Sequence, residues 1–131
     1  MSQTTWSGPL ASGDINAGKT GGPNIGLALL SQTVLINFDA TLVQNGTVYL
    51  PYKSQIVDII VDVLTQYDSA TSATLSVGTS SAATTYASGV NVKTGIRVLP
   101  TFTAAQLAAM DDIGTNGTVV ATVTSVGQPT V

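Results

Sequence analysis

Apolar and polar residues alternate along most of the chain from Thr33 onward, and this period of two predicts a succession of β-strands. The alternation is clearest in ATLSVG, where Ala73, Leu75 and Val77 would share one buried face, and in TVVATVTSV near the end of the chain. Valine, isoleucine and threonine dominate these runs, as is typical of strands. The predicted strands are residues 33–43, 47–50, 55–65, 73–78, 84–88, 90–93, 96–100 and 118–126.

Two Asn-Gly pairs provide turn signals between these runs. Asn45-Gly46 separates residues 33–43 from residues 47–50 and predicts a two-residue hairpin, because both residues tolerate the positive φ that such turns need. Asn116-Gly117 introduces the last strand, and we interpret it as a hairpin turn as well. Pro51 is expected to end the run before it, since proline donates no ladder hydrogen bond.

One short helix interrupts the predicted strands. In FTAAQLAAMDDIG, Thr103 stands three residues before Gln106, which is the pattern of a capping box. Alanine and leucine favour the helix, and Gly114 is predicted to cap its C-terminal end. Many short strands with a single helix predict an all-β fold, an antiparallel, jelly-roll-like β-sandwich spanning residues 32–131.

Residues 1–31 differ from the rest of the chain. They are rich in glycine and sustain neither period before Ile25, so we predict an extended N-terminal arm that ends in a first strand around residues 25–30. Trp6, Leu10 and Ile15 are isolated apolar residues in this arm, and we predict that they anchor it on a neighbouring molecule.

The composition narrows the classes of function. Only 8% of the 131 residues are charged, against roughly 25% in an average soluble protein. The net charge is −3 and the four basic residues are scattered, so no nucleic-acid-binding surface is predicted. The chain has no cysteine and no histidine, which excludes disulfides and thiolate metal sites and disfavours most enzyme classes. No membrane span, secretory signal, cofactor or metal site is predicted.

A phosphate-binding motif is spelled by Gly13, Gly18, Lys19 and Thr20. That motif binds nucleotide only between a buried strand and a helix that begins at the Lys-Thr pair. No apolar run precedes it, and the glycines and proline at residues 21–23 oppose a helix. Asp62 ends a DIIVD run that resembles a Walker B strand, but the parallel α/β frame is missing. We therefore predict no nucleotide hydrolysis.

Paired carboxylates are the next candidates for chemistry. A strand at residues 55–65 would place Asp58 and Asp62 on one face, about 13 Å apart, which is wide for a glycosidase pair. In that strand the core-facing residues would be Val57, Ile59, Val61 and Val63, and the opposite face would be Ile56, Asp58, Ile60 and Asp62. Such a mixed face fits either a subunit contact or solvent. Asp111 and Asp112 alone provide too few ligands for a cation site.

Three long stretches carry a family resemblance. SGPLASGDINAGKTGGPNIGLALLSQT, LPYKSQIVDIIVDVLTQYDSATSATLSVGT and RVLPTFTAAQLAAMDDIGTNGTVVATVT resemble small head decoration, or cement, proteins of tailed bacteriophages. The resemblance covers nearly the whole chain. It implies a β-rich, non-enzymatic homo-oligomer, a trimer, that is made in the host cytoplasm and binds the major capsid protein on the outer surface of the phage head.

The expected contact residues are Trp6, Leu10, Ile15, Ile56, Asp58 and Ile60. The alternative is a tail or fibre receptor-binding module, for which the tyrosines would form a carbohydrate platform at Tyr49, Tyr52, Tyr67 and Tyr86. A nucleotide hydrolase is a distant third, and nucleotide binding would distinguish it.

Overall fold

A computed structural model describes residues 29–37, 41–94 and 96–127 of the chain. The chain divides into two units, Met1–Gln32 and Thr33–Val131, and the fold below is that of the second unit. The predicted arm, residues 1–31, lies outside the described residues except for its last three, as do most of the predicted strand at 25–30 and the anchors Trp6, Leu10 and Ile15.

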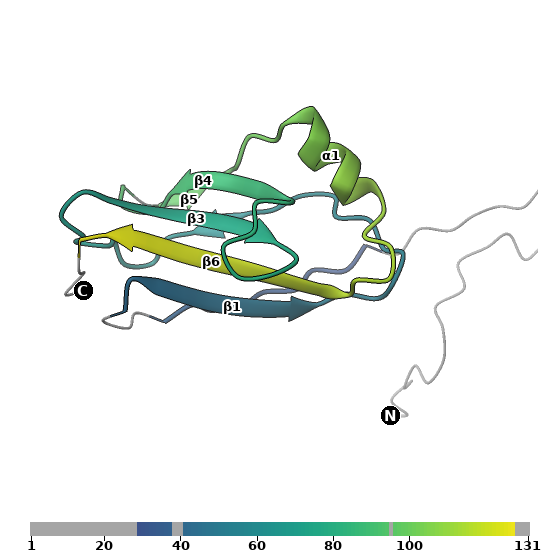
Figure 1. Cartoon of the computed structure of the whole chain (residues 1–131), viewed down its shortest axis with the longest axis horizontal. Helices are drawn as coiled ribbons and strands as arrows, with labels where there is room; N and C mark the ends of the chain where they lie inside the picture. The colour runs from purple at the N-terminus through teal and green to yellow at the C-terminus, as the bar shows by residue number, and fades with distance from the viewer. Residues whose placement is uncertain (1–28, 38–40, 95, 128–131) are drawn as a thin grey trace, which may run out of the picture. The chain divides into compact units, whose positions relative to one another are not determined.

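The second unit is built on a four-stranded antiparallel sheet with the strand order β1-β6-β3-β4 (Figure 1). Its strands are β1 (Val43–Tyr49), β3 (Ser72–Gly78), β4 (Ala87–Asn91) and β6 (Thr118–Val126). β6 lies in the centre and pairs with both β1 and β3 along most of its length. The all-β prediction is confirmed, and so is the buried face of β3 formed by Ala73, Leu75 and Val77.

A second layer covers one face of this sheet, which we call the inner face. It contains a two-residue ladder between β2 (Val61–Asp62) and β5 (Arg97–Val98), together with chain that belongs to no strand. Ile36, Ile59 and Phe102 of this layer pack against the core. The buried core residues are Ala73, Leu75, Val77, Tyr86, Ala87, Val90, Val92, Met110, Ile113, Val119 and Val123. The jelly-roll sandwich stays a prediction, because one short ladder is the only strand pairing among the described residues of this layer.

The hairpin predicted at Asn45-Gly46 is wrong. Both residues lie inside β1, opposite Thr122 and Ala121 of β6. A Cβ atom on Gly46 would come within 2.8 Å of the Ile36 side chain, so the glycine serves close packing instead of a turn. Residues 33–37 form no strand themselves and cross the inner face of β1 at this point.

Asn116-Gly117 does not join two strands of a hairpin either. The pair follows a turn at residues 114–115 and leads from α1 (Ala104–Asp111) into β6. The backbone carbonyl of Gly117 accepts a hydrogen bond from the Leu50 N–H at 2.7 Å, which extends the β1–β6 ladder by one pair.

The capping box of α1 is confirmed. The Thr103 hydroxyl accepts the Gln106 N–H, and the Gln106 side chain accepts the Thr103 N–H. The predicted C-terminal cap is wrong by two residues: extended Asp112 caps the helix, and its carboxylate accepts the Gly114 N–H at 2.7 Å. Gly114 takes a φ of +64°, so it provides the turn after the cap.

The opposite, outer face of the sheet is partly covered by the loop between β3 and β4 (Figure 1). The loop is held by the Ala82 N–H, which donates to the Thr122 hydroxyl at 2.9 Å, and by Ser81, which donates to the Asn45 side chain at 3.0 Å. Thr122 in turn donates to the same Asn45 oxygen at 2.7 Å and is fully buried. A polar cluster thus fixes this loop on the sheet.

Candidate interaction surface

The segment 55–65 has a different arrangement of faces from the predicted one. Ile56 is half-buried against the core and Val57 is exposed, the reverse of what strict alternation predicts. From Ile59 onward the prediction holds, because Ile59, Val61 and Val63 are half-buried and the residues between them are exposed. The change occurs around Asp58, whose carboxylate accepts the backbone N–H of Ile59 at 2.8 Å. Such a local bond competes with the strand conformation.

Ile56 is therefore not part of an exposed contact face. Its N–H donates to the carbonyl of Met110 at 2.8 Å, which ties this segment to the end of α1. Asp58 and Ile60 are both exposed at the surface. Of the three residues predicted in this region, two can thus contact a partner.

Asp62 forms an ion pair with Arg97 across the β2–β5 ladder. The guanidinium donates to both carboxylate oxygens, at 2.8 and 3.2 Å. This hydrogen-bonded pairing holds the pKa of the Asp62 carboxyl below its ordinary value and raises the pKa of Arg97. β2 pairs antiparallel with a two-residue strand, whereas a Walker B strand belongs to a parallel sheet. Asp62 is accounted for by this pairing.

Breaking this ion pair should change stability only slightly, because both side chains are largely exposed. The lowered pKa of Asp62 means that the pair stabilises the fold above the ordinary carboxyl pKa of about 3.9 and that this contribution is lost as the pH falls through the lowered value. Asp62→Asn should therefore have a slightly lower melting temperature than the parent at pH 7, and the difference should shrink as the pH falls below the ordinary carboxyl value. A difference of the same size at neutral and at strongly acidic pH would show that the ion pair is not its source.

Three large apolar side chains near this ion pair in sequence are exposed. Ile60 is 55% exposed, Leu64 81% and Leu99 62%. Continuing the register of Val61 with Val98 by one residue places Ile60 opposite Leu99. We call the exposed side chains of this ladder the β2–β5 surface; they are Ile60, Asp62, Leu64, Arg97 and Leu99. Exposed aliphatic side chains that gather on one face are a feature of protein contacts.

Asp111 and Asp112 both have local partners. The Asp111 carboxylate accepts the side-chain amide of Gln55 at 2.9 Å, and Asp112 caps α1. No group of three or more potential metal-ligating residues occurs within the described part of the chain. Both carboxylates thus have structural explanations.

The four tyrosines do not form one platform. Tyr86 lies in the core, and the Tyr67 hydroxyl donates to the Gln44 side chain at 2.7 Å, with burial raising the pKa of both phenols. Tyr49 and Tyr52 are about equally exposed, at 71% and 70%. Tyr49 and Tyr52 are thus the tyrosines that offer the most ring surface to a ligand.

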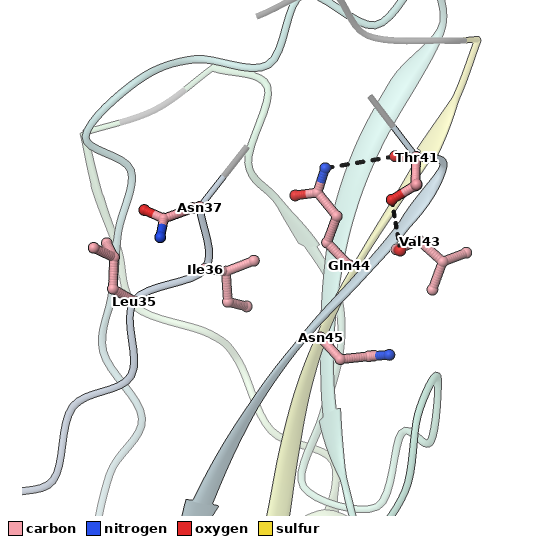
Figure 2. A pocket seen from close by; sticks show the side chains of 7 residues that line it. All are labelled: Leu35, Ile36, Asn37, Thr41, Val43, Gln44 and Asn45. Atoms are coloured by element: carbon pink, nitrogen blue, oxygen red, sulfur yellow. Dashed lines mark hydrogen bonds between the residues drawn. The ribbon is translucent and has the colours of Figure 1, made fainter. Parts of the chain in front are cut away.

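A pocket of about 350 Å³ lies beside the start of β1. Leu35, Ile36 and Asn37 line one side of it, and Thr41 and residues 43–45 line the other (Figure 2). Gln44 reaches into it and its amide donates to the Thr41 carbonyl at 3.5 Å. The described residues of the lining carry no charged group.

The glycine-rich motif at residues 13–20 lies outside the described residues, so the prediction that it binds no nucleotide stays a prediction. No helix within residues 29–37, 41–94 and 96–127 is both long and apolar enough to cross a bilayer. Comparison with protein-family models, curated proteins and solved structures finds no match for this chain.

Proposed function

We propose that this protein is a bacteriophage head decoration protein: a non-enzymatic homo-oligomer that is made in the host cytoplasm and binds the major capsid protein on the outer surface of the head. The proposal begins from the resemblance of three sequence stretches to such proteins, and the β-rich fold is compatible with it. It involves no cofactor, metal, nucleic acid or membrane.

The observation that carries the proposal is the β2–β5 surface. Exposed Ile60, Leu64 and Leu99 lie on the same side of the ladder as the Asp62–Arg97 ion pair, and this pairing offsets part of the cost of removing the two charges from water at a contact. Burying large aliphatic side chains at a contact yields about 1.5–3 kcal/mol each. A surface with these residues can therefore add substantially to binding of a capsid subunit.

Binding to heads tests the proposal directly. Heads from a phage that carries this gene, purified after deletion of the gene, should bind the added protein in a co-sedimentation assay. Ile60→Asp and Leu99→Asp should each raise the Kd at least about tenfold, which corresponds to about 1.4 kcal/mol, because each places a charge in the apolar contact.

The matched control is Leu107→Asp, since Leu107 on α1 is exposed to a similar extent, at 53%. It should bind heads like the parent protein. Absence of head binding by the parent would overturn the proposal, whereas parent-like binding by both β2–β5 variants would move the contact to another surface.

Exposed Tyr49 and Tyr52 are the one observation in favour of a carbohydrate-binding module of a tail or fibre. That function predicts binding of the isolated protein to a glycan array and its loss in Tyr49→Ala or Tyr52→Ala. The decoration function predicts no such binding.

A further inference from the structure

Within residues 29–37, 41–94 and 96–127, one edge of the four-stranded sheet has no strand beside it. At the two ends of the β1–β6 ladder, the Leu42 carbonyl accepts the Ser125 N–H and the Leu50 N–H donates to the Gly117 carbonyl. Because bonding direction alternates along a strand, the even-numbered residues of β1 face β6 and the odd-numbered ones face away. The outward residues are Val43, Asn45, Thr47 and Tyr49. Among the described residues, no strand pairs with this side of β1.

The opposite edge of the sheet is protected, and β1 is not. β4 has one extra residue relative to β3 between Val77 and Leu75, with Gly89 at a φ of +66°, and the Gln106 side chain of α1 contacts Ser88. Bulges and covering helices are the usual means of blocking an edge. β1 contains seven residues without a charge, a proline or a bulge, and nothing in the described part of the chain blocks its edge against another strand.

We propose that β1 pairs antiparallel with β1 of a second copy, about a two-fold axis at Gly46. In an antiparallel pair the residue numbers of opposite residues have a constant sum, and this sum must be even for two odd-numbered, outward-facing residues to lie opposite one another. The register centred on Gly46 pairs all four outward residues. It places Val43 opposite Tyr49 of the second copy and Asn45 opposite Thr47 of the second copy. Each such pair exchanges two backbone hydrogen bonds, and the two sheets become one continuous sheet.

The side chains suit this register. Val43 with Tyr49 is a β-branched–aromatic pair, and both side chains are exposed in the single chain. No like charges meet, because β1 carries none. Gly46 at the axis contributes no side chain of its own, and the Val34 and Ile36 side chains lie over it on the inner face. On the inner side, Val48 of the second copy lies opposite Gln44, beside the pocket of Figure 2. The Val43 carbonyl already accepts the Thr41 hydroxyl and retains a second lone pair for the ladder.

This inference stands apart from head binding, since it concerns β1 and not the β2–β5 surface. The proposed contact makes the homo-oligomer a two-fold symmetric dimer, whereas the family resemblance implies a trimer.

Sedimentation of the full chain tests the pairing. At about 100 μM, a concentration at which contacts with a Kd below that value are mostly formed, the parent protein should sediment as a dimer. Thr47→Pro should be monomeric at the same concentration with an unchanged circular dichroism spectrum, because it removes an outward N–H and leaves the β6 ladder intact. Thr47→Val keeps the N–H and should remain a dimer. A monomeric parent, or a dimer that survives Thr47→Pro, would overturn the proposal.

Cysteine pairs test the register, and the natural chain has no cysteine to interfere. The double variant Val43→Cys/Tyr49→Cys should give a covalent dimer on mild oxidation, because the paired Cα atoms would lie about 5.5 Å apart. Within one chain the two positions are about 20 Å apart along the strand and cannot be bridged. Val43→Cys/Thr47→Cys should cross-link at least tenfold more slowly. Equal or faster cross-linking of this control would overturn the register.

Discussion

Replacement of Gln106 by leucine should lower the free energy of unfolding by about 2–4 kcal/mol, because one buried side chain makes three hydrogen bonds. Its oxygen accepts the Thr103 N–H at 2.9 Å, and its amide donates to the Thr84 carbonyl at 3.2 Å and the Ser88 hydroxyl at 3.4 Å. Leucine fills a similar volume but leaves these groups without partners. Urea unfolding followed by circular dichroism measures the change.

Two further variants show which hydrogen bonds of Gln106 cause the loss of stability: those of the helix cap, or those to the β3–β4 loop and β4. Thr103→Ala removes the hydroxyl that accepts the Gln106 N–H and should cost only about 1 kcal/mol, since Gln106 still bonds Thr84 and Ser88. Leu107→Gln changes an exposed side chain of the same helix and should stay within about 0.5 kcal/mol of the parent. A loss in Gln106→Leu no larger than in Leu107→Gln would contradict this account of how α1 is held.

Gly78→Ala should be about as damaging, with an expected loss of about 3 kcal/mol or more. The new Cβ would lie 2.5 Å from the Cβ of Ala83 and 2.7 Å from its backbone carbonyl atoms, so the loop would have to move. That movement would strain the bonds from Ala82 to Thr122 and from Ser81 to Asn45. The melting temperature should fall by roughly 10 °C or more, given about 4–8 °C per kcal/mol for a domain of this size.

Ser76→Ala is the control for Gly78→Ala. Ser76 lies on the same face of β3, two residues earlier, and its replacement should change stability by less than about 0.5 kcal/mol. If Gly78→Ala melts like Ser76→Ala, the β3–β4 loop does not depend on close contact with the sheet.

The central strands β3 and β6 could be predicted from sequence because apolar and polar side chains alternate along them. One face of each strand packs on the core, and this produces the alternation. β6 was predicted with its observed bounds and β3 to within one residue. The helix start was also predictable, since the Thr103–Gln106 capping box is a local signal that needs no tertiary partner.

Non-local packing explains the failures. Asn45-Gly46 has the composition of a hairpin turn, but the side chains of Val34 and Ile36 cross Gly46 and require a glycine inside a strand. Enough apolar residues to pack on the core occur in residues 33–37 and in most of 55–65. A strand ladder, however, also needs a second backbone alongside, and within these two segments only Val61–Asp62 has one. The alternation of apolar residues therefore does not distinguish a segment that only packs on the core from a strand that is hydrogen-bonded in a sheet.

The candidate contact surface was only partly predictable for the same reason. The prediction that Ile60 is exposed is confirmed. The prediction that Ile56 is exposed is wrong, because the alternation shifts at Asp58, whose carboxylate accepts the Ile59 N–H. Leu99 and Arg97 join the surface only through the β2–β5 pairing, which no sequence signal indicated. The sequence pattern also gave no sign that polar residues such as Thr122 are buried. Their burial depends on hydrogen-bond partners from distant parts of the chain, and every buried side-chain polar atom in the described part of the chain has one.

Electron cryomicroscopy of the intact phage particle tests the central proposal most directly. Heads of the parent phage should show extra density on the outer capsid surface that fits the second unit, residues 33–131, and that is absent from heads of a gene-deletion strain. The side facing the capsid should be the β2–β5 surface around Ile60 and Leu99. Identical heads with and without the gene, or density for this fold on the tail alone, would contradict the assignment.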